Sequence, residues 1–243
     1  MIDYHLDINI KIIPTHPWHI GSGLGRADLN RLTIKDGLNR PYIPGSHLKG
    51  ILRQSCENLA TTIGLDVVSP HQRDHLASFT GSRDTIFIID RLFGSRFEGG
   101  KLFCRSAYWS EDAEKAFYER AHITSQTRTA IDRALQTSKE KHLFQTEYVH
   151  GGFFSTTISG RHNFLTSEQK GDWPVEYALL LGGLCLLDRM GGDKTHGKGQ
   201  ISIVIDEIRF NGEIVSLEAA LEPLVEEEMS LWIIMQREEL YGV

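Results

Sequence analysis

The chain has 243 residues, of which 40% are hydrophobic and 24% are charged, an ordinary composition for a globular protein. It is long enough to bury a core that needs no disulfide or metal for stability. The formal net charge of −6 argues against a uniformly basic nucleic-acid-binding surface, although a local basic groove is compatible with it.

Cysteine usage and apolar runs predict a cytoplasmic protein with no membrane partner. The three cysteines, Cys56, Cys104 and Cys185, are widely spaced and form no C-x-x-C pair, as expected in a reducing compartment. The longest apolar run, residues 177–187, is shorter than the roughly 20 residues that span a bilayer. The first five residues lack the basic start and apolar core of an export signal.

The first quarter of the chain predicts a strand, a glycine-rich loop and a helix. Apolar and polar side chains alternate from Leu6 to Ile12, which indicates a half-buried strand. The loop at residues 21–28 is glycine-rich, and residues 31–36 alternate again and predict a short strand. A helix is expected from about Ser46 to Ala60, with apolar residues on one face.

The middle of the chain predicts strands separated by insertions. Residues 64–84 are polar and contain glycine and proline, which favours a surface insertion. Strands are expected at 85–90, 101–109 and 152–159, and residues 111–121 have helical composition. Residues 122–150 are rich in Thr, Gln, Lys and His with little apolar periodicity, which we interpret as a projecting segment.

The last quarter predicts helix, strand and helix. Pro174 is suited to the first turn of a helix, and the residues from there to about Met190 are apolar on most faces, as in a buried helix. Residues 200–210 alternate as a strand does, and residues 216–241 predict a final helix. No composition shift marks a boundary, so we expect a single domain over residues 1–243. The order of elements is compatible with an α+β, ferredoxin-like core, but periodicity alone does not select that topology.

The run PYIPGSHLKGILR at residues 41–53 combines a rigid approach with a basic first helical turn. Two prolines restrict the backbone, and Ser46 is a candidate N-cap. Lys49 and Arg53 are four residues apart and share a helix face. Free backbone N–H groups beside cations suit a phosphate. The alternative is an ordinary capped helix with solvated cations.

A second run, GGDKTHGKGQISIV at residues 191–204, follows the predicted buried helix and precedes a strand. Its four glycines, with Lys194 and Lys198, would let the backbone approach a polyanion closely. A helix C-cap and turn would use glycine for similar reasons. The run is not a Walker motif, because it lacks the Gly-Lys-Ser/Thr ending.

These two runs resemble the signatures of the RAMP superfamily of CRISPR-associated proteins. His47 replaces the usual serine of the first signature, and Thr195 and His196 replace the usual Ser-Arg of the second. Other runs resemble the guide-binding backbone subunits of type III effector complexes, in collinear order: RLFG at 91–94, GKLF at 100–103, IDR at 131–133, the stretch around Glu147, and GGFF at 151–154.

The resemblance implies a ferredoxin-like (RRM-like) core with long insertions near 64–84 and 111–150. It implies that copies of the subunit stack along a guide crRNA, contact target RNA, and assemble with other CRISPR effector subunits. A hairpin "thumb" that interrupts the guide–target duplex is placed at about residues 122–150. The RNA-binding candidates are Ser46, Lys49, Arg53, Arg133, Gly191, Gly192, Lys194, Gly197 and Lys198. Such contacts would hold the guide without reading its sequence.

Asp28 is the candidate catalytic and metal-binding residue, because it is the only acid in its loop before Asp36. An aspartate near glycines often only stabilises a turn. In the family, however, an aspartate in this loop supports metal-dependent cleavage of target RNA. The resemblance therefore implies an endoribonuclease that uses Mg²⁺ or another divalent cation, with Asp28 as a metal ligand or as an aid to deprotonation of a ribose 2′-hydroxyl.

Other readings stay open at this point. The protein could be a non-catalytic backbone or capping subunit of the same complex. It could be a metal-independent guide-processing ribonuclease that uses His16, His19 or His47, although these could equally be hydrogen-bonded loop histidines. It could be a ferredoxin-like domain that binds proteins only. His71 and His75 have the i, i+4 spacing of two metal ligands, or they belong to a solvated insertion.

Overall fold

The computed structural model describes residues 4–25, 31–65, 67, 88–95, 99–109, 123–163 and 173–224. Its strands are β1 (Tyr4–Pro14), β2 (Leu102–Cys104), β3 (Tyr108–Trp109), β4 (Ile123–Asp132), β5 (Thr137–Val149), β6 (Phe154–His162), β7 (Ile201–Phe210) and β8 (Glu213–Ile214). Its α-helices are α1 (Gly45–Thr62), α2 (Ile88–Phe93), α4 (Val175–Cys185) and α5 (Leu217–Leu221), with 3₁₀ turns at Lys194–His196 and Glu222–Leu224. In the part of the chain that is described, no helix is both long and apolar enough to cross a membrane.

The main sheet is antiparallel and has the strand order β2-β6-β1-β7-β8. Its alternating apolar side chains face one side: Ile8 lies opposite Ile158 of β6 and Ile208 of β7, and all three are buried. Chain order β1-α1-β2-β6-α4-β7 with this spatial order is the ferredoxin-like arrangement. The structure therefore confirms the expected α+β, ferredoxin-like fold.

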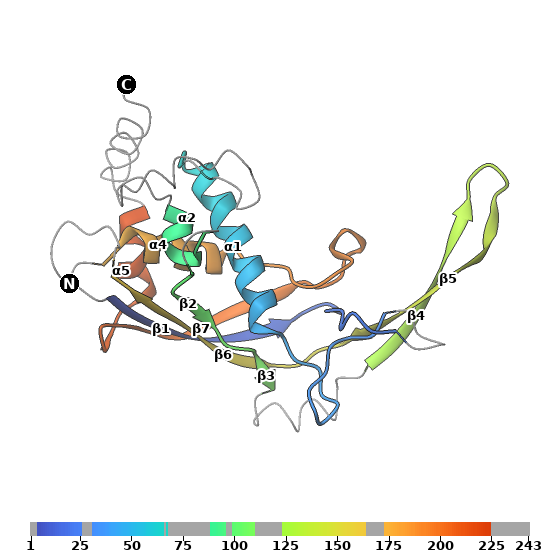
Figure 1. The fold of residues 1–243 in the computed structure, drawn as a ribbon, viewed down its shortest axis with the longest axis horizontal. Coiled ribbons are helices and arrows are strands. Elements are labelled where there is room, and N and C mark those ends of the chain that lie inside the picture. Colours follow the sequence, from blue (N-terminus) through green and yellow to red (C-terminus); the bar gives the residue numbers. More distant parts are fainter. Residues whose placement is uncertain are drawn as a thin grey trace.

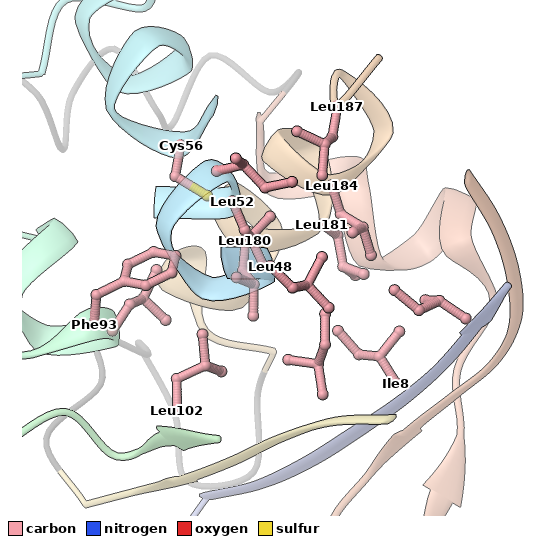
Figure 2. Close-up of a cluster of buried hydrophobic side chains, with 14 of the residues drawn as sticks. Ile8, Leu48, Leu52, Cys56, Phe93, Leu102, Leu180, Leu181, Leu184 and Leu187 are labelled. Carbon is pink, nitrogen blue, oxygen red and sulfur yellow. The ribbon is translucent and has the colours of Figure 1, made fainter. Parts of the chain in front are cut away.

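Helices α1 and α4 cover the apolar face of the sheet (Figure 1). Figure 2 shows leucines of both helices meeting Ile8 of β1, Phe93 of α2 and Leu102 of β2 in one core. The two helices approach closely because α4 carries glycine at the crossing: a Cβ on Gly183 would lie 2.4 Å from Cys56 Sγ. The Ser55 hydroxyl also donates to the Gly183 carbonyl at 2.7 Å.

Strands β4 and β5 form a two-stranded hairpin, inserted between core strands β2 and β6, that projects away from the sheet (Figure 1). Its base is attached to the core because Trp18 and Val149 exchange two backbone hydrogen bonds, both of 2.9 Å. The turn at its far end spans residues 133–136. The projecting segment expected near 122–150 is confirmed over the described residues 123–150, as a hairpin.

The N-terminus of α1 differs from the expectation. Pro44, not Ser46, is the N-cap, and no side chain caps the helix. Ser46 already lies inside the helix. The first helical N–H group, that of Gly45, instead donates to the Ser106 hydroxyl at 3.1 Å. A cap from another segment therefore replaces the local one, which the sequence around Ser46 could not reveal.

Three element predictions in the first half of the chain also need correction. Residues 88–90, expected as part of a strand, begin helix α2, because Ile88, Ile89, Leu92 and Phe93 recur with helical spacing and are all buried. Residues 31–36 form isolated β-bridges rather than a strand. The range 101–109 is split into β2 and β3, because Ala107 pairs with Ile43 between them.

Helix α4 ends at Cys185 instead of near Met190. The residues beyond it pair with the start of β7: the Met190 N–H donates to Gly199 O and the Ile201 N–H to Asp188 O, both at 2.8 Å. This pairing uses backbone groups that a longer helix would need. The predicted helix at 111–121, most of the insertion at 64–84, and the predicted C-terminal helix after Leu224 lie outside the described residues.

Candidate nucleic-acid interface

The two signature runs, far apart in the sequence, meet in the fold. The Gly191 N–H donates to Nε2 of His47, in the first turn of α1, at 3.0 Å. Gly191 has a φ of 76°, and a Cβ there would lie 2.3 Å from the His19 carbonyl oxygen. The Gly192 N–H donates to that same oxygen at 2.8 Å. The loop at residues 191–199, which we call the glycine-rich loop, is therefore fixed against both α1 and the segment around His19.

A buried polar network joins this region to the base of the hairpin. Nδ1 of His19 donates to the Glu147 carbonyl at 2.8 Å. The Glu147 carboxylate accepts the Thr33 N–H at 2.9 Å and Lys35 Nζ at 2.7 Å. Burial lowers the pKa of His19, even though its bond to the Glu147 carbonyl acts in the opposite direction. This network holds β5 and residues 31–35 in a fixed relation.

Asp193 belongs to a cluster of charged and polar side chains, which we call the Asp193 cluster: Arg31, Arg128, Tyr148, Asp193 and Lys198. The carboxylate accepts the Tyr148 hydroxyl and lies 3.5 Å from Arg31 Nη1 and 3.6 Å from Arg128 Nη1. Lys198 Nζ lies 5.1 Å from the centroid of the Tyr148 ring, and the Arg128 guanidinium carbon 5.7 Å from it. Two arginines from different segments thus approach one acid, and a third cation, Lys198, lies over the adjacent Tyr148 ring.

The electrostatics of the cluster leave it positively charged. Burial alone would raise the pKa of Asp193, but the Tyr148 hydroxyl, Arg31 and Arg128 together hold it below the usual aspartate value. Burial and the neighbouring carboxylate raise the pKa of Tyr148 to about 12, so the phenol is neutral near pH 7. With three cations and one anion, the cluster can attract a phosphate group.

The cations predicted on α1 have protein partners instead. Lys49 Nζ donates to the Leu102 carbonyl at 2.9 Å, and burial lowers its pKa. Arg53 donates to Glu57 at 2.8 Å, to the Gly94 carbonyl at 2.8 Å and to Asp90 at 2.9 Å. The side chain of Arg53 is only 17% exposed. An RNA-binding role for Lys49 and Arg53 stays a prediction.

The remaining RNA-binding candidates are spread over the molecule. Gly191, Gly192, Lys194, Gly197 and Lys198 lie together in the glycine-rich loop. Gly197 has a φ of 73° with open space where a Cβ would stand. Ser46 precedes His47 in α1, and Arg133 is exposed in the turn at the far end of the hairpin. The structure therefore gathers five of the nine predicted residues in one loop.

Asp28, the predicted catalytic and metal-binding residue, lies outside the described residues, as do His71 and His75. The described residues on either side of its segment bond each other, and one of them bonds the hairpin: the Leu32 N–H donates to Leu24 O at 3.3 Å, and the Arg31 N–H to Gln145 O of β5 at 3.1 Å. Over the described part of the chain, no group of three or more His, Cys, Asp or Glu side chains could hold a metal ion. These residues alone do not form a site for Mg²⁺.

Three nearby residues, Asp36, His19 and His47, make structural hydrogen bonds. The Asp36 carboxylate accepts the Leu38 and Arg40 N–H groups, both at 2.9 Å, and Arg40 Nε at 3.0 Å, so it stabilises a turn. His19, which lies in a loop, and His47, which lies in the first turn of α1, are both hydrogen-bonded, and burial lowers the pKa of His47.

Sequence reasoning missed four members of the Asp193 cluster: Arg31, Arg128, Tyr148 and Asp193. Their positions gave one partial signal, because Arg31 and Asp193 each lie within three residues of a residue singled out from the motifs. Tyr148 directly follows Glu147, whose surroundings the resemblance singled out. Arg128 gave no signal, since its proximity depends on the register of the hairpin, in which it lies opposite Phe144.

Comparisons with known proteins agree with this architecture. A chain in the cryo-EM structure of type III-B Cmr-beta in the apo state has the same fold, with a TM-score of 0.53 over 82% of this chain and 97% of that chain, at 14% sequence identity. No curated protein matches the sequence. The RAMP superfamily matches over residues 11–202, a range that contains the first signature run, the hairpin and the glycine-rich loop. The chain therefore belongs to the RAMP superfamily.

Proposed function

We propose that this protein is a guide-RNA-binding backbone subunit of a type III CRISPR effector complex. The observation that carries the proposal is the Asp193 cluster, where the partly exposed cations Arg31 and Arg128 lie beside the glycine-rich loop at the base of the hairpin. Membership of the RAMP superfamily and the fold shared with a chain of the type III-B Cmr-beta structure support it.

The cluster would bind the backbone of RNA rather than its bases. Guanidinium groups bind phosphate through paired N–H donors, and contacts to phosphate carry no sequence information. Arg31, Arg128 and Lys198 come from different segments, so they can follow an extended strand. A subunit that serves many guides requires this kind of contact, with the hairpin free to meet target RNA.

Cleavage of the target RNA is the second part of the proposal and rests on the sequence resemblance. Asp28 would then act with a divalent cation, which would stabilise developing negative charge at the phosphate. A non-catalytic backbone or capping subunit is the alternative, and a histidine-dependent ribonuclease that works without metal is another.

The test of RNA binding uses the full-length protein, purified with its natural partner subunits and then alone. We expect guide-length RNA to co-purify. Changing Arg31, Arg128 and Lys198 together to glutamine should weaken binding of single-stranded RNA by about 10- to 100-fold for all sequences, and should shallow its salt dependence by about two units of slope. Absence of co-purifying RNA, or unchanged affinity in this variant, would overturn the proposal.

A matched control removes three cations from the face of the sheet that the helices leave open: Lys11, Arg161 and Arg209, each nearly half exposed. This triple glutamine variant has the same change of net charge and should bind RNA as the wild type does. An equal loss in both variants would mean that only overall charge matters.

The cleavage arm of the test uses Asp28→Ala in the assembled complex with labelled target RNA, with and without Mg²⁺. Loss of cutting with intact guide binding supports the catalytic role of Asp28. Full cutting by the variant removes Asp28 from the mechanism. No cutting by the wild-type complex favours the non-catalytic alternative, and cutting of precursor RNA in EDTA favours the histidine-dependent one.

A further inference from the structure

The one acid in the Asp193 cluster stands where a phosphate would be expected. Its carboxylate lies between Arg31 and Arg128, and a carboxylate and a phosphate present similar acceptor oxygens to a guanidinium. We propose that Asp193 is an internal competitor of RNA phosphate, which occupies the two arginines in the absence of RNA and so sets the affinity of the interface. This inference rests on the proposed RNA-binding function.

The ion pairs of Asp193 are loose enough to exchange. Their N–O distances of 3.5 and 3.6 Å contrast with 2.7 Å for the pair of Lys35 and Glu147 in the neighbouring network. The arginine side chains are 48% and 36% exposed, whereas that of Asp193 is 13% exposed. Exposed ion pairs contribute little free energy, so a phosphate can draw the arginines away at small cost.

The acid itself is held independently of the arginines. Tyr148 donates its hydroxyl to the carboxylate, and the preceding glycines are bonded to His47 and His19. Asp193 also has a φ of 57°, a conformation that aspartate tolerates better than most residues. When the arginines turn to RNA, the carboxylate therefore stays in place and repels the bound phosphate.

The consequence is an interface whose affinity is capped by a built-in negative charge. Arg128 belongs to the hairpin and Arg31 to the segment beside it. Exchange of partners at Asp193 would thus also release one of the contacts between the hairpin and the glycine-rich loop. Binding of the RNA backbone and the position of the hairpin would be linked through this one side chain.

The test compares the full-length wild type with Asp193→Asn, which keeps an oxygen to accept the Tyr148 hydroxyl and removes the charge. We expect Asp193→Asn to bind single-stranded RNA about 3- to 10-fold more tightly at low salt, with the gain shrinking as salt rises. Asp206→Asn is the control, because Asp206 pairs with Lys11 on the open face of the sheet, and its affinity for RNA should not change.

A second pair of variants tests whether the arginines mediate the effect. Asp193→Asn is added to a variant that already carries Arg31→Gln and Arg128→Gln. There it should raise the logarithm of the RNA affinity by less than half of the increase that Asp193→Asn gives in the otherwise wild-type protein. The same gain in both backgrounds would overturn the competition, as would unchanged or weaker binding by Asp193→Asn when thermal unfolding shows it folded. If the wild type binds no RNA, the proposed function fails first; if it binds and Asp193→Asn changes nothing, only this inference fails.

Discussion

The two basic regions of the molecule use their cations in opposite ways. On α1, Lys49 and Arg53 are half-buried and donate to protein acceptors. At the base of the hairpin, the Arg31 side chain is 48% exposed and that of Arg128 is 36% exposed, and the two share one carboxylate at N–O distances of 3.5 and 3.6 Å. The comparison teaches that a cation in a signature motif can stabilise the domain, while two of the three cations of the Asp193 cluster, Arg31 and Arg128, lie outside both signature runs.

The largest expected effect is on stability and comes from Arg53→Ala. Its guanidinium lies 2.9 Å from Asp90, whose side chain is only 3% exposed. Removing one partner of a buried charge pair is strongly destabilising, so the free energy of unfolding should fall by about 3 to 4 kcal/mol. Urea denaturation measures this loss, and Lys11→Ala, at an exposed pair of 3.1 Å, should cost less than about 1 kcal/mol.

A double variant that adds Lys49→Ala to Arg53→Ala tests whether the cations of α1 stabilise the domain or bind RNA. The motif at residues 41–53 predicts that Lys49→Ala with Arg53→Ala weakens RNA binding. The contacts of both residues instead predict that the fraction of the double variant that remains folded binds RNA with nearly wild-type affinity. If the folded double variant shows a weaker salt dependence of RNA binding than the wild type, Lys49 and Arg53 contact RNA after all.

A pH-dependent effect should appear in the core and not at the interface. Burial lowers the pKa of His162 from 6.5 to about 4, and the ring bonds the Tyr177 hydroxyl at 2.9 Å. The unfolded chain therefore binds a proton more readily than the folded protein between these pH values. The contribution of neutral His162 to the free energy of unfolding is fully present above about pH 6.5, and up to about 3 kcal/mol is lost as the pH approaches 4. Urea titrations of wild type and His162→Gln check this: the variant should lack that part of the pH dependence, and parallel curves would contradict it.

The smallest effect distinguishes two glycines of one loop. Gly191 and Gly197 have nearly equal φ values, 76° and 73°, but a Cβ on Gly191 would meet the His19 carbonyl at 2.3 Å, whereas one on Gly197 would meet nothing within 4 Å. Gly197→Ala should lower the free energy of unfolding by about 1 kcal/mol, because alanine is strained at a positive φ. Gly191→Ala should cost about 1 to 2 kcal/mol more, because the loop must move. Thermal unfolding of both variants measures the difference; equal costs would mean that the loop adapts freely.

Much of the fold was predictable because it depends on local pattern. Alternation in β1 and β7 and the apolar run of α4 gave these elements to within a few residues, except where α4 ends early. The strand predicted for residues 88–90 was wrong because a short apolar run suits a buried helix as well as a strand. The predicted N-cap at Ser46 was wrong because Ser106, remote in sequence, supplies the acceptor.

The candidate site was predictable only in part. The glycine-rich loop was predictable because positions with positive φ or close backbone approach require glycine, and glycine is visible in the sequence. In the Asp193 cluster, the sequence singled out Lys198 and the run that contains Asp193, but not Arg31 or Arg128. Those two arginines and Tyr148 come together only through the register of the hairpin and its attachment to Trp18.

By itself, then, the sequence determined the elements and the loop where glycine is required, because periodicity and backbone conformation are properties of neighbouring residues. Only the tertiary structure decided which cations are used internally and which remain exposed. That depends on long-range contacts: Arg53 finds Asp90 and the Gly94 carbonyl, and Asp193 finds two arginines from distant segments. Charge in a sequence is local, but the partner that neutralises it is a property of the fold.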